Sequence, residues 1–458
     1  MGLRANRVAS CFLALILACF VWRPATVRAL EGFCDPSFQD CRASLLQLIA
    51  NERVGIDIAF WFMEDARYTT ALINKFKSGV PVRVVVDPRA NVKNPLNAYR
   101  LAELAAAGIP MRQRTTSGIL HWKAAIFVGQ GTVQFGGANY SAWAWVPASP
   151  YQNYTDEVIR FTENASVVNT FMTRFDDVWT NQTAYQDYAN ILTPPARRYP
   201  AYPKDPSLNF PPMEDYAARA LKQYNAETSR IDVIMYRITD RRHADAMIAA
   251  VRRGIPVRLI TEPTSYRDPN YIWHSWNIDR MYMAGVQIKQ RQHAGLNHGK
   301  LVLLYALTMS IFGSSNWTTA SSSSQEEHNQ FLVDATAFSY FQQQFLRKWN
   351  NSAGFVENVP FVPRSPGTPT YVGPADVTRQ STAVRLTWMP GKWAHKADIY
   401  FGTSPTPPLL AADVPVAPQS TASYTLPTLQ PGRTYYWKIV SKTMANKTKA
   451  GPIWSFGT

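Results

Sequence analysis

The stretch IDIAF at Ile56–Phe60 recurs as IDVIM at Ile231–Met235. The stretch GVPVR at 79–83 recurs as GIPVR at 254–258, displaced along the chain by the same number of positions. A constant offset between separate matches indicates an internal duplication. Because the period is far longer than a solenoid repeat, it predicts two domain-sized halves.

Each half alternates short β-branched runs with helical stretches, such as 68–77 in the first half and 243–252 in the second. This alternation predicts α/β layering around a sheet. Between the halves, residues 191–212 contain seven prolines, so we expect a connector that neither pairs into a sheet nor continues a helix. A second proline-rich segment, 360–369, ends the duplicated region.

The N-terminus has the pattern of a secretory signal peptide. Arg4 and Arg7 precede an apolar run at 11–22, and VRA at 27–29 offers a cleavage site. A lipoprotein signal ending at Cys19 is an alternative. No later stretch reaches about 18 consecutive apolar residues, the length of a membrane-spanning helix. We therefore expect a secreted or periplasmic protein.

Cleavage would change both the charge and the cysteine count. The 458 residues carry a formal charge of +15, and the four arginines of the signal peptide leave +11 without them. Of this, +6 lies in residues 365–458, which suggests that the C-terminal segment tethers the protein to an anionic surface. Cys34 and Cys41, the only cysteines after cleavage, predict a local disulfide in an exported protein, with two free thiols as the alternative.

Short alternating runs after the second proline-rich segment, such as 384–388 and 435–440, predict an all-β immunoglobulin-like sandwich. The stretch LQPGRTYY at 429–436 resembles the fibronectin type III corner, with Tyr436 as the corner tyrosine and Trp388 as the core tryptophan. Another small β-sandwich is the alternative. The predicted order is a signal peptide (1–29), a first α/β lobe (30–190), a connector (191–212), a second α/β lobe (213–359), a linker (360–369) and the fibronectin type III-like domain (370–458).

Residues suited to phosphoryl chemistry recur at matching places in both halves. Each half has a histidine, a lysine two positions later and an asparagine that follows at the same interval in both halves: His121, Lys123 and Asn139, then His298, Lys300 and Asn316. Residues two apart on a strand project to one face. There the imidazole can act on phosphorus while the ammonium group holds a non-bridging oxygen.

These motifs resemble the phospholipase D superfamily, whose signature is HxKxxxxD followed by GSxN, present twice in two-lobed members. The resemblance covers about residues 30–359 and implies two α/β lobes that form one catalytic unit. Two departures stand out. The motif aspartate is replaced by Val128 and Tyr305, and the first turn, GGAN, lacks the serine that the second has as Ser314.

The resemblance implies a two-step displacement without a metal or cofactor. One histidine attacks phosphorus, and the other protonates the leaving alcohol and then activates water. By the usual order in two-lobed relatives, His121 is the nucleophile and His298 the acid and base, although the sequence itself does not distinguish them. The phosphate would be held by Lys123, Lys300, Asn139, Asn316 and Ser314. By analogy with the family, we expect Glu157 and Glu327 to orient the histidines, with ordinary solvent-facing acids as the alternative.

Aromatic residues surround both motifs and bear on the substrate: Trp122, Tyr140, Trp143, Trp145, Tyr151, Tyr154 and Trp317. They could form a rim for a lipid headgroup, stack unpaired bases, or pack between loops. No run of Lys or Arg flanks either motif, which favours a lipid over a nucleic acid.

We therefore expect a secreted phospholipase D-like phosphodiesterase that hydrolyses phospholipid headgroups, with no obligate protein partner. The alternatives are an exported, metal-independent endonuclease and a non-catalytic binding protein on a degenerate scaffold.

Overall fold

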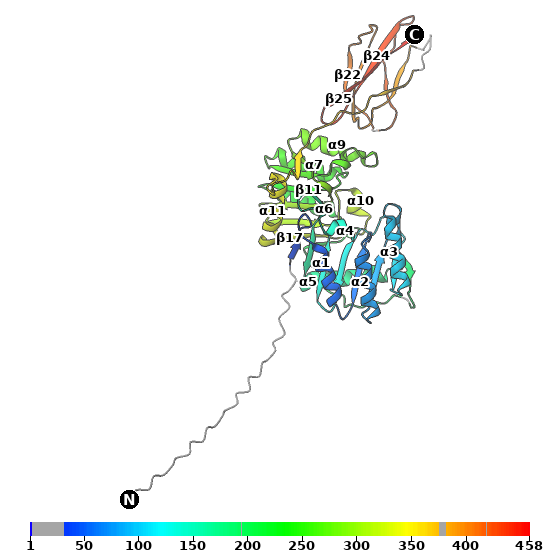
Figure 1. Ribbon diagram of the computed structural model, residues 1–458. Helices are drawn as coiled ribbons and strands as arrows, with labels where there is room; N and C mark the ends of the chain where they lie inside the picture. Colours follow the sequence, from blue (N-terminus) through cyan, green and yellow to red (C-terminus); the bar gives the residue numbers. More distant parts are fainter. Residues whose placement is uncertain (2–31, 194, 375–381, 418) are drawn as a thin grey trace.

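The computed structural model describes residues 1, 32–193, 195–374, 382–417 and 419–458 (Figure 1). The predicted signal peptide lies outside these residues except for Met1, so it stays a prediction. Along the chain come a first lobe, a second lobe and a C-terminal β-domain, drawn from blue through green to red in Figure 1. Within the described part of the chain, no helix is long and apolar enough to cross a bilayer.

The first lobe is built on an eight-stranded sheet in the order β1-β8-β6-β5-β2-β3-β4-β9. Its strands are β1 (Gly32–Cys34), β2 (Ile56–Phe60), β3 (Val82–Val86), β4 (Met111–Arg114), β5 (Lys123–Phe127), β6 (Thr132–Gly136), β8 (Ile159–Thr162) and β9 (Tyr185–Ala189). The central strands β2, β3 and β5 are buried on both faces, because helices cover both sides of the sheet.

The helices of this lobe are α1 (Cys41–Asn51), α2 (Ala66–Lys77), the 3-10 helix η1 (Pro88–Val92), α3 (Pro95–Ala106), α4 (Ala142–Trp145) and α5 (Ala165–Thr180). Helix α2 begins at Asp65, whose carboxylate accepts a hydrogen bond from the backbone N–H of Arg67. A disulfide between Cys34 and Cys41 joins β1 to the start of α1.

The second lobe repeats this plan, with its sheet in the order β10-β17-β16-β15-β11-β12-β13-β18. Its strands are β10 (Leu208–Asn209), β11 (Ile231–Met235), β12 (Val257–Thr261), β13 (Gln287–Arg291), β15 (Lys300–Leu304), β16 (Met309–Gly313), β17 (Asn329–Val333) and β18 (Asn358–Pro360). Its helices are α6 (Tyr216–Ala226), α7 (Arg241–Arg252), α8 (Pro263–Tyr266), η2 (Pro269–Tyr271), α9 (Ile272–Met283), α10 (Thr319–Ser323) and α11 (Ala335–Asn350). The repeated strand order confirms the duplication.

The proline-rich connector differs from its prediction at one point. Leu208 and Asn209 form β10, which pairs antiparallel with β17, so the expectation that 191–212 adds nothing to a sheet was wrong. Neither residue is a proline, and both keep the backbone N–H that a strand needs. The linker at 360–369 also begins inside the second lobe, because Pro360 belongs to β18 and Phe361 is buried in the core of that lobe.

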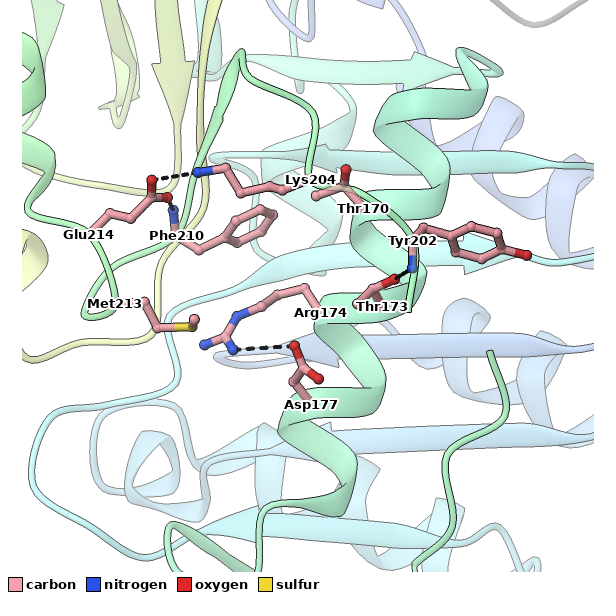
Figure 2. A pocket seen from close by; sticks show the side chains of 9 residues that line it. All are labelled: Thr170, Thr173, Arg174, Asp177, Tyr202, Lys204, Phe210, Met213 and Glu214. Atoms are coloured by element: carbon pink, nitrogen blue, oxygen red, sulfur yellow. Dashed lines mark hydrogen bonds and ion pairs between the residues drawn. The ribbon is translucent and has the colours of Figure 1, made fainter. Parts of the chain in front are cut away.

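Residues 197–205 of the connector pack along α5, as Figure 2 shows for Tyr202 and Lys204. The N–H of Tyr202 donates to Thr173 at 2.9 Å, and the N–H of Phe210 to Glu214 at 3.1 Å. Helix α5, the connector and the residues just after it enclose a small pocket, and none of the predicted site residues lines this pocket.

The C-terminal domain consists of two antiparallel sheets, ordered β19-β20-β23 and β22-β21-β24-β25. Its strands are β19 (Thr370–Gly373), β20 (Arg385–Met389), β21 (Lys396–Gly402), β22 (Leu409–Pro415), β23 (Ala422–Thr425), β24 (Thr434–Lys442) and β25 (Thr448–Gly457). Trp388 is fully buried, as expected of a core tryptophan. The corner tyrosine is Tyr435 and not Tyr436, because Tyr435 is the buried one and its hydroxyl accepts the N–H of Gln430 at 3.0 Å.

Candidate active site

Two short ladders between the lobes align the residues of the site. In one, β14 (Ala294–Asn297) pairs in parallel with β7 (Asn153–Asp156), and the N–H of His298 donates to the carbonyl of Asp156 at 3.1 Å. In the other, Leu120 bridges Glu326, and the N–H of His121 donates to the carbonyl of Glu326 at 2.8 Å. Each ladder therefore brings a histidine of one lobe beside a glutamate of the other.

The two histidine–glutamate pairs cross between the lobes. Nδ1 of His121 lies 2.8 Å from Oε2 of Glu327, and Nδ1 of His298 lies 2.6 Å from Oε1 of Glu157. All four residues are buried, with at most 8% of their surface exposed. A carboxylate on Nδ1 fixes the orientation of an imidazole and leaves Nε2 for chemistry. The two predicted acids are thus in contact with the histidines, each with the histidine of the opposite lobe.

The lysines stand beside the histidines but outside the cavity lining. Strands β5 and β15 begin at Lys123 and Lys300, so the histidines come just before the strands and not on them as expected. Each Nζ donates to the carbonyl of the histidine in its own motif, for Lys123 at 2.7 Å. An ammonium group has two further donors, and their contact with a phosphate oxygen stays a prediction.

Both histidines line a cavity of about 820 Å³ between the lobes. Asn139 and Asn316 line it as well, and the side-chain oxygen of each has no hydrogen-bond partner among the described residues. Ser314 does not line it. Its hydroxyl accepts the N–H of His328 at 3.0 Å, so it lies behind the cavity and is not placed as a phosphate ligand.

The missing serine of the first turn has a geometric reason. Gly137 occupies the place that Ser314 holds in the second lobe, and a Cβ on Gly137 would lie 2.6 Å from Oε2 of Glu157. Glu157 therefore fills the space that a serine side chain would need. In the second lobe, the Ser314 side chain lies close enough to Glu327 to favour the ionised form of that carboxyl group.

The two pairs differ in protonation. Burial raises the pKa of Glu157 to about 8. Burial opposes ionisation of Glu327 too, but His121, Lys123 and Ser314 lower its pKa. Burial lowers the pKa of His121 to about 4, and burial together with the charge of Lys300 lowers the pKa of His298 well below its usual value. At neutral pH, the His298–Glu157 pair therefore holds one proton more than the His121–Glu327 pair.

Most of the aromatic residues around the motifs are in the core. Tyr154 is 2% exposed, and four others are completely buried: Trp122, Tyr140, Trp145 and Trp317. The indole of Trp122 donates to the carbonyl of Glu327 at 3.1 Å and so supports the site from behind. Of the alternatives that the sequence left open, packing therefore holds for these residues, and the rim and base-stacking alternatives do not.

The aromatic residues that line the cavity come from other segments: Trp61, Phe62, Tyr236, Tyr271 and Trp273. Trp61 and Tyr236 directly follow β2 and β11, and their rings lie 6.4 and 4.9 Å from those of His121 and His298. The signal was present in the sequence, since both follow the duplicated strand at equivalent positions of the two halves.

Val128 and Tyr305, which stand where the family motif has aspartates, support the fold. Val128 packs against the core shared by the lobes, and the Tyr305 hydroxyl donates to Asp232. Among the described residues, no group of three or more His, Cys, Asp or Glu side chains is arranged to hold a metal ion.

Comparison with known proteins agrees with this geometry. Residues 45–179 and 221–349 match the family described as cardiolipin synthase, PLD-like domain, so the chain belongs to the phospholipase D-like family, as the motifs predicted. The mitochondrial cardiolipin hydrolase of Chlamydomonas reinhardtii is 26% identical over 133 residues, which cover 29% of this chain and 57% of that protein. The mouse (Mus musculus) protein of the same name is 26% identical over 154 residues, covering 33% of this chain and 66% of its own length. The chain thus spans less than two thirds of either relative.

A solved structure extends the likeness to both lobes. Phosphatidylserine synthase of Haemophilus influenzae superposes with a TM-score of 0.54 and 11% identity, covering 72% of this chain and 87% of that protein. At this identity the likeness concerns the fold. The lobes therefore have the architecture of the phospholipase D superfamily.

Proposed function

We propose that the protein is an exported phosphodiesterase that hydrolyses the headgroup ester of a phospholipid. The observation that carries the proposal is the pair of buried histidines that face one cavity, each held at Nδ1 by a glutamate of the opposite lobe. A decayed scaffold would have no reason to keep both pairs.

The reaction runs in two displacements. Nε2 of His121 bonds to phosphorus as the bond to the headgroup oxygen breaks, and Nε2 of His298 gives that oxygen its proton. Water then bonds to phosphorus and loses a proton to His298 as the bond to His121 breaks. The products are a phosphatidate and the headgroup alcohol, and His298 ends with the proton it began with.

The different protonation of the pairs supports this division of roles. A nucleophilic histidine needs a free lone pair on Nε2. The His121–Glu327 pair lacks the extra proton, so Nε2 of His121 has this lone pair. An acid needs a proton there, which the His298–Glu157 pair retains because burial raises the pKa of Glu157 to about 8. The pKa of Glu327 is lowered chiefly by His121 and Lys123, and Ser314 adds a smaller contribution that has no counterpart at Gly137.

An exposed apolar stripe beside the cavity favours a lipid substrate. Val92 lines the cavity and is 84% exposed, and Leu96 and Tyr99 in the next helix, α3, are 51% and 65% exposed. Trp273, on the cavity lining of the second lobe, is 52% exposed. Exposed apolar side chains at the mouth of a site fit contact with a lipid surface.

Export is proposed from the N-terminal sequence and supported by the disulfide. Cys34 and Cys41 are bonded at 2.06 Å, and structural disulfides are typical of proteins in oxidising compartments.

The test is hydrolysis of phosphatidylglycerol in neutral detergent micelles with EDTA present, followed by release of phosphatidate and glycerol. We expect the wild type to be active, and Glu157→Gln and Glu327→Gln each to lose at least about 100-fold, the scale of general acid–base catalysis. Glu214→Gln is the matched control, because Glu214 is a surface acid paired with Lys204. Single-stranded DNA is assayed in parallel. Cleavage of DNA without lipid hydrolysis would point to a nuclease, and no activity on either would refute the proposal.

A further inference from the structure

The two flanks of the cavity differ at one pair of equivalent positions. Phe62 follows β2 and Arg237 follows β11 at the same place in the duplicated sequence, and both line the cavity. Phe62 is 6% exposed and places an apolar ring at this position of the first-lobe flank, which also includes Arg89 and Lys93. Arg237 places a guanidinium group on the second-lobe flank, next to His298.

The guanidinium group of Arg237 is held in place but not neutralised. It stacks on the ring of Tyr271 at 3.4 Å and lies 4.9 Å from the ring of Tyr236. Nη2 donates to the Tyr236 hydroxyl at 3.3 Å, and Nε is buried without a partner in the described structure. The ion pairs of the described residues do not include Arg237. By contrast Arg89, which also lines the cavity, is paired with Asp87 at 2.6 Å.

The cationic side chains that line the cavity are Arg89, Lys93 and Arg237, and no carboxylate is among the residues that line it. Arg89 is paired with Asp87, and Lys93 is exposed to solvent. Arg237 is the partly buried cation of this lining that has no ion-pair partner among the described residues. An unpaired cation in a binding cavity favours an anionic ligand group.

The direction of the reaction indicates which part of the substrate meets Arg237. If His121 attacks phosphorus, the leaving oxygen is on the opposite side, where His298 protonates it. The leaving headgroup then lies on the second-lobe flank, and the lipid part lies toward Trp61, Phe62 and Val92.

We propose that Arg237 forms a subsite for a second anionic group on the headgroup, a phosphate separated from the scissile phosphodiester by a short alcohol. This rests on the proposed lipid hydrolysis and names its substrate class. The planar guanidinium group can bind two phosphate oxygens at once, and its stacking on Tyr271 fixes its plane.

The experiment compares two lipids that differ only in this group, phosphatidylglycerol and phosphatidylglycerol phosphate. Each is presented at the same low mole fraction in neutral detergent micelles, which keeps the surface charge small. We expect the wild-type kcat/KM to favour the phosphorylated headgroup by about tenfold or more, the scale of a charge-assisted hydrogen bond. In Arg237→Gln that preference falls to near unity, and Arg237→Lys keeps part of it.

The matched control is Arg241→Gln, which removes the same charge from an exposed arginine that pairs with Asp245. It should leave the preference as in the wild type. If Arg237→Gln slows both lipids equally and keeps their ratio, Arg237 only supports the rim and the subsite is refuted. A wild type that hydrolyses phosphatidylglycerol without preference also refutes the subsite but not the proposed function. A wild type inactive on both lipids, including one that cleaves single-stranded DNA instead, overturns both.

Discussion

At the scale of single residues, the site depends on small differences between duplicated positions. Gly137 and Ser314 are equivalent, yet only the glycine leaves room for Oε2 of Glu157. We infer that this exchange, together with burial, separates the proton-holding pair from the nucleophilic pair. A duplication with identical halves would give both histidines the same protonation.

Replacing Gly137 by serine tests this. The new Cβ would lie 2.6 Å from Oε2 of Glu157, so the carboxylate must move away from its place on Nδ1 of His298. We expect kcat to fall at least about tenfold with little loss of folding stability, because the displaced atom ends a flexible side chain. Gly457→Ser is the control, since nothing lies within 4 Å of a Cβ there. Wild-type kcat in Gly137→Ser would contradict the role given to Glu157.

The pH dependence of kcat/KM follows from the same groups. His121 must be unprotonated, and burial lowers its pKa to about 4, so activity should rise with pH through about 4. The His298–Glu157 pair must hold its proton, and burial raises the pKa of Glu157 to about 8, so activity should fall above about 8. Burial also lowers the pKa of Lys300 to about 8, which removes an ammonium group in the same range. A profile still rising at pH 9 would be incompatible with these assignments.

At the scale of elements, the ladder between β7 and β14 fixes the distance between His298 and Glu157. Gly295 in β14 has a φ of +98°, and a Cβ there would lie 2.1 Å from the carbonyl oxygen of Tyr154. Only a glycine allows the two strands to approach this closely.

We therefore expect Gly295→Ala to separate β7 from β14. Activity should then fall by more than the loss of folding stability explains. Gly285→Ala is the matched control, because Gly285 has a φ of +97° but its nearest neighbour is Val251 Cγ1 at an ordinary 3.5 Å. Both variants should lose about 1–2 kcal/mol of unfolding free energy through the positive φ. Only Gly295→Ala should also lose most of its kcat, measured below its own melting temperature. Equal kcat in the two variants would show that the ladder does not position the site.

The strands and the two motifs could be predicted from the sequence because they depend on local patterns. The duplication, the HxK motifs and the central strands at 56–60 and 231–235 all follow from residue type and spacing. The crossing of the pairs does not, because His121 meets Glu327 only through contacts between lobes, 206 residues apart. For the same reason the sequence left the place of Trp122 open between a rim and the core: its buried neighbours include Phe171 of the first lobe and Phe210 of the connector.

At the scale of the whole molecule, the C-terminal domain contacts the second lobe through a buried carboxyl group. Asp279 of α9 accepts the Tyr266 hydroxyl at 2.6 Å and faces Thr443 and Ala445 of the β-domain. Burial raises its pKa from 3.8 to about 6. Because burial outweighs the hydrogen bonds that favour the carboxylate, the folded state is most stable when Asp279 is protonated.

The sign of this effect is testable. Because the folded-state pKa is above the unfolded one, the contribution is complete below pH 3.8 and is lost as pH rises through about 6. Asp279→Asn, which mimics the protonated form, should gain stability relative to the wild type at pH 7.5, by up to about 3 kcal/mol, and not at pH 4. Calorimetric unfolding at both pH values measures the difference. The same difference at both pH values would contradict the assignment.

The proposed mechanism requires that His121 becomes covalently bonded to phosphorus while His298 serves as acid and base. The most direct measurement is to quench wild-type turnover of a phospholipid in alkaline denaturant and to locate the adduct by peptide mass spectrometry. We predict a phosphatidyl group on the peptide that contains His121. An adduct on His298, or turnover without any adduct on His121, would contradict the mechanism.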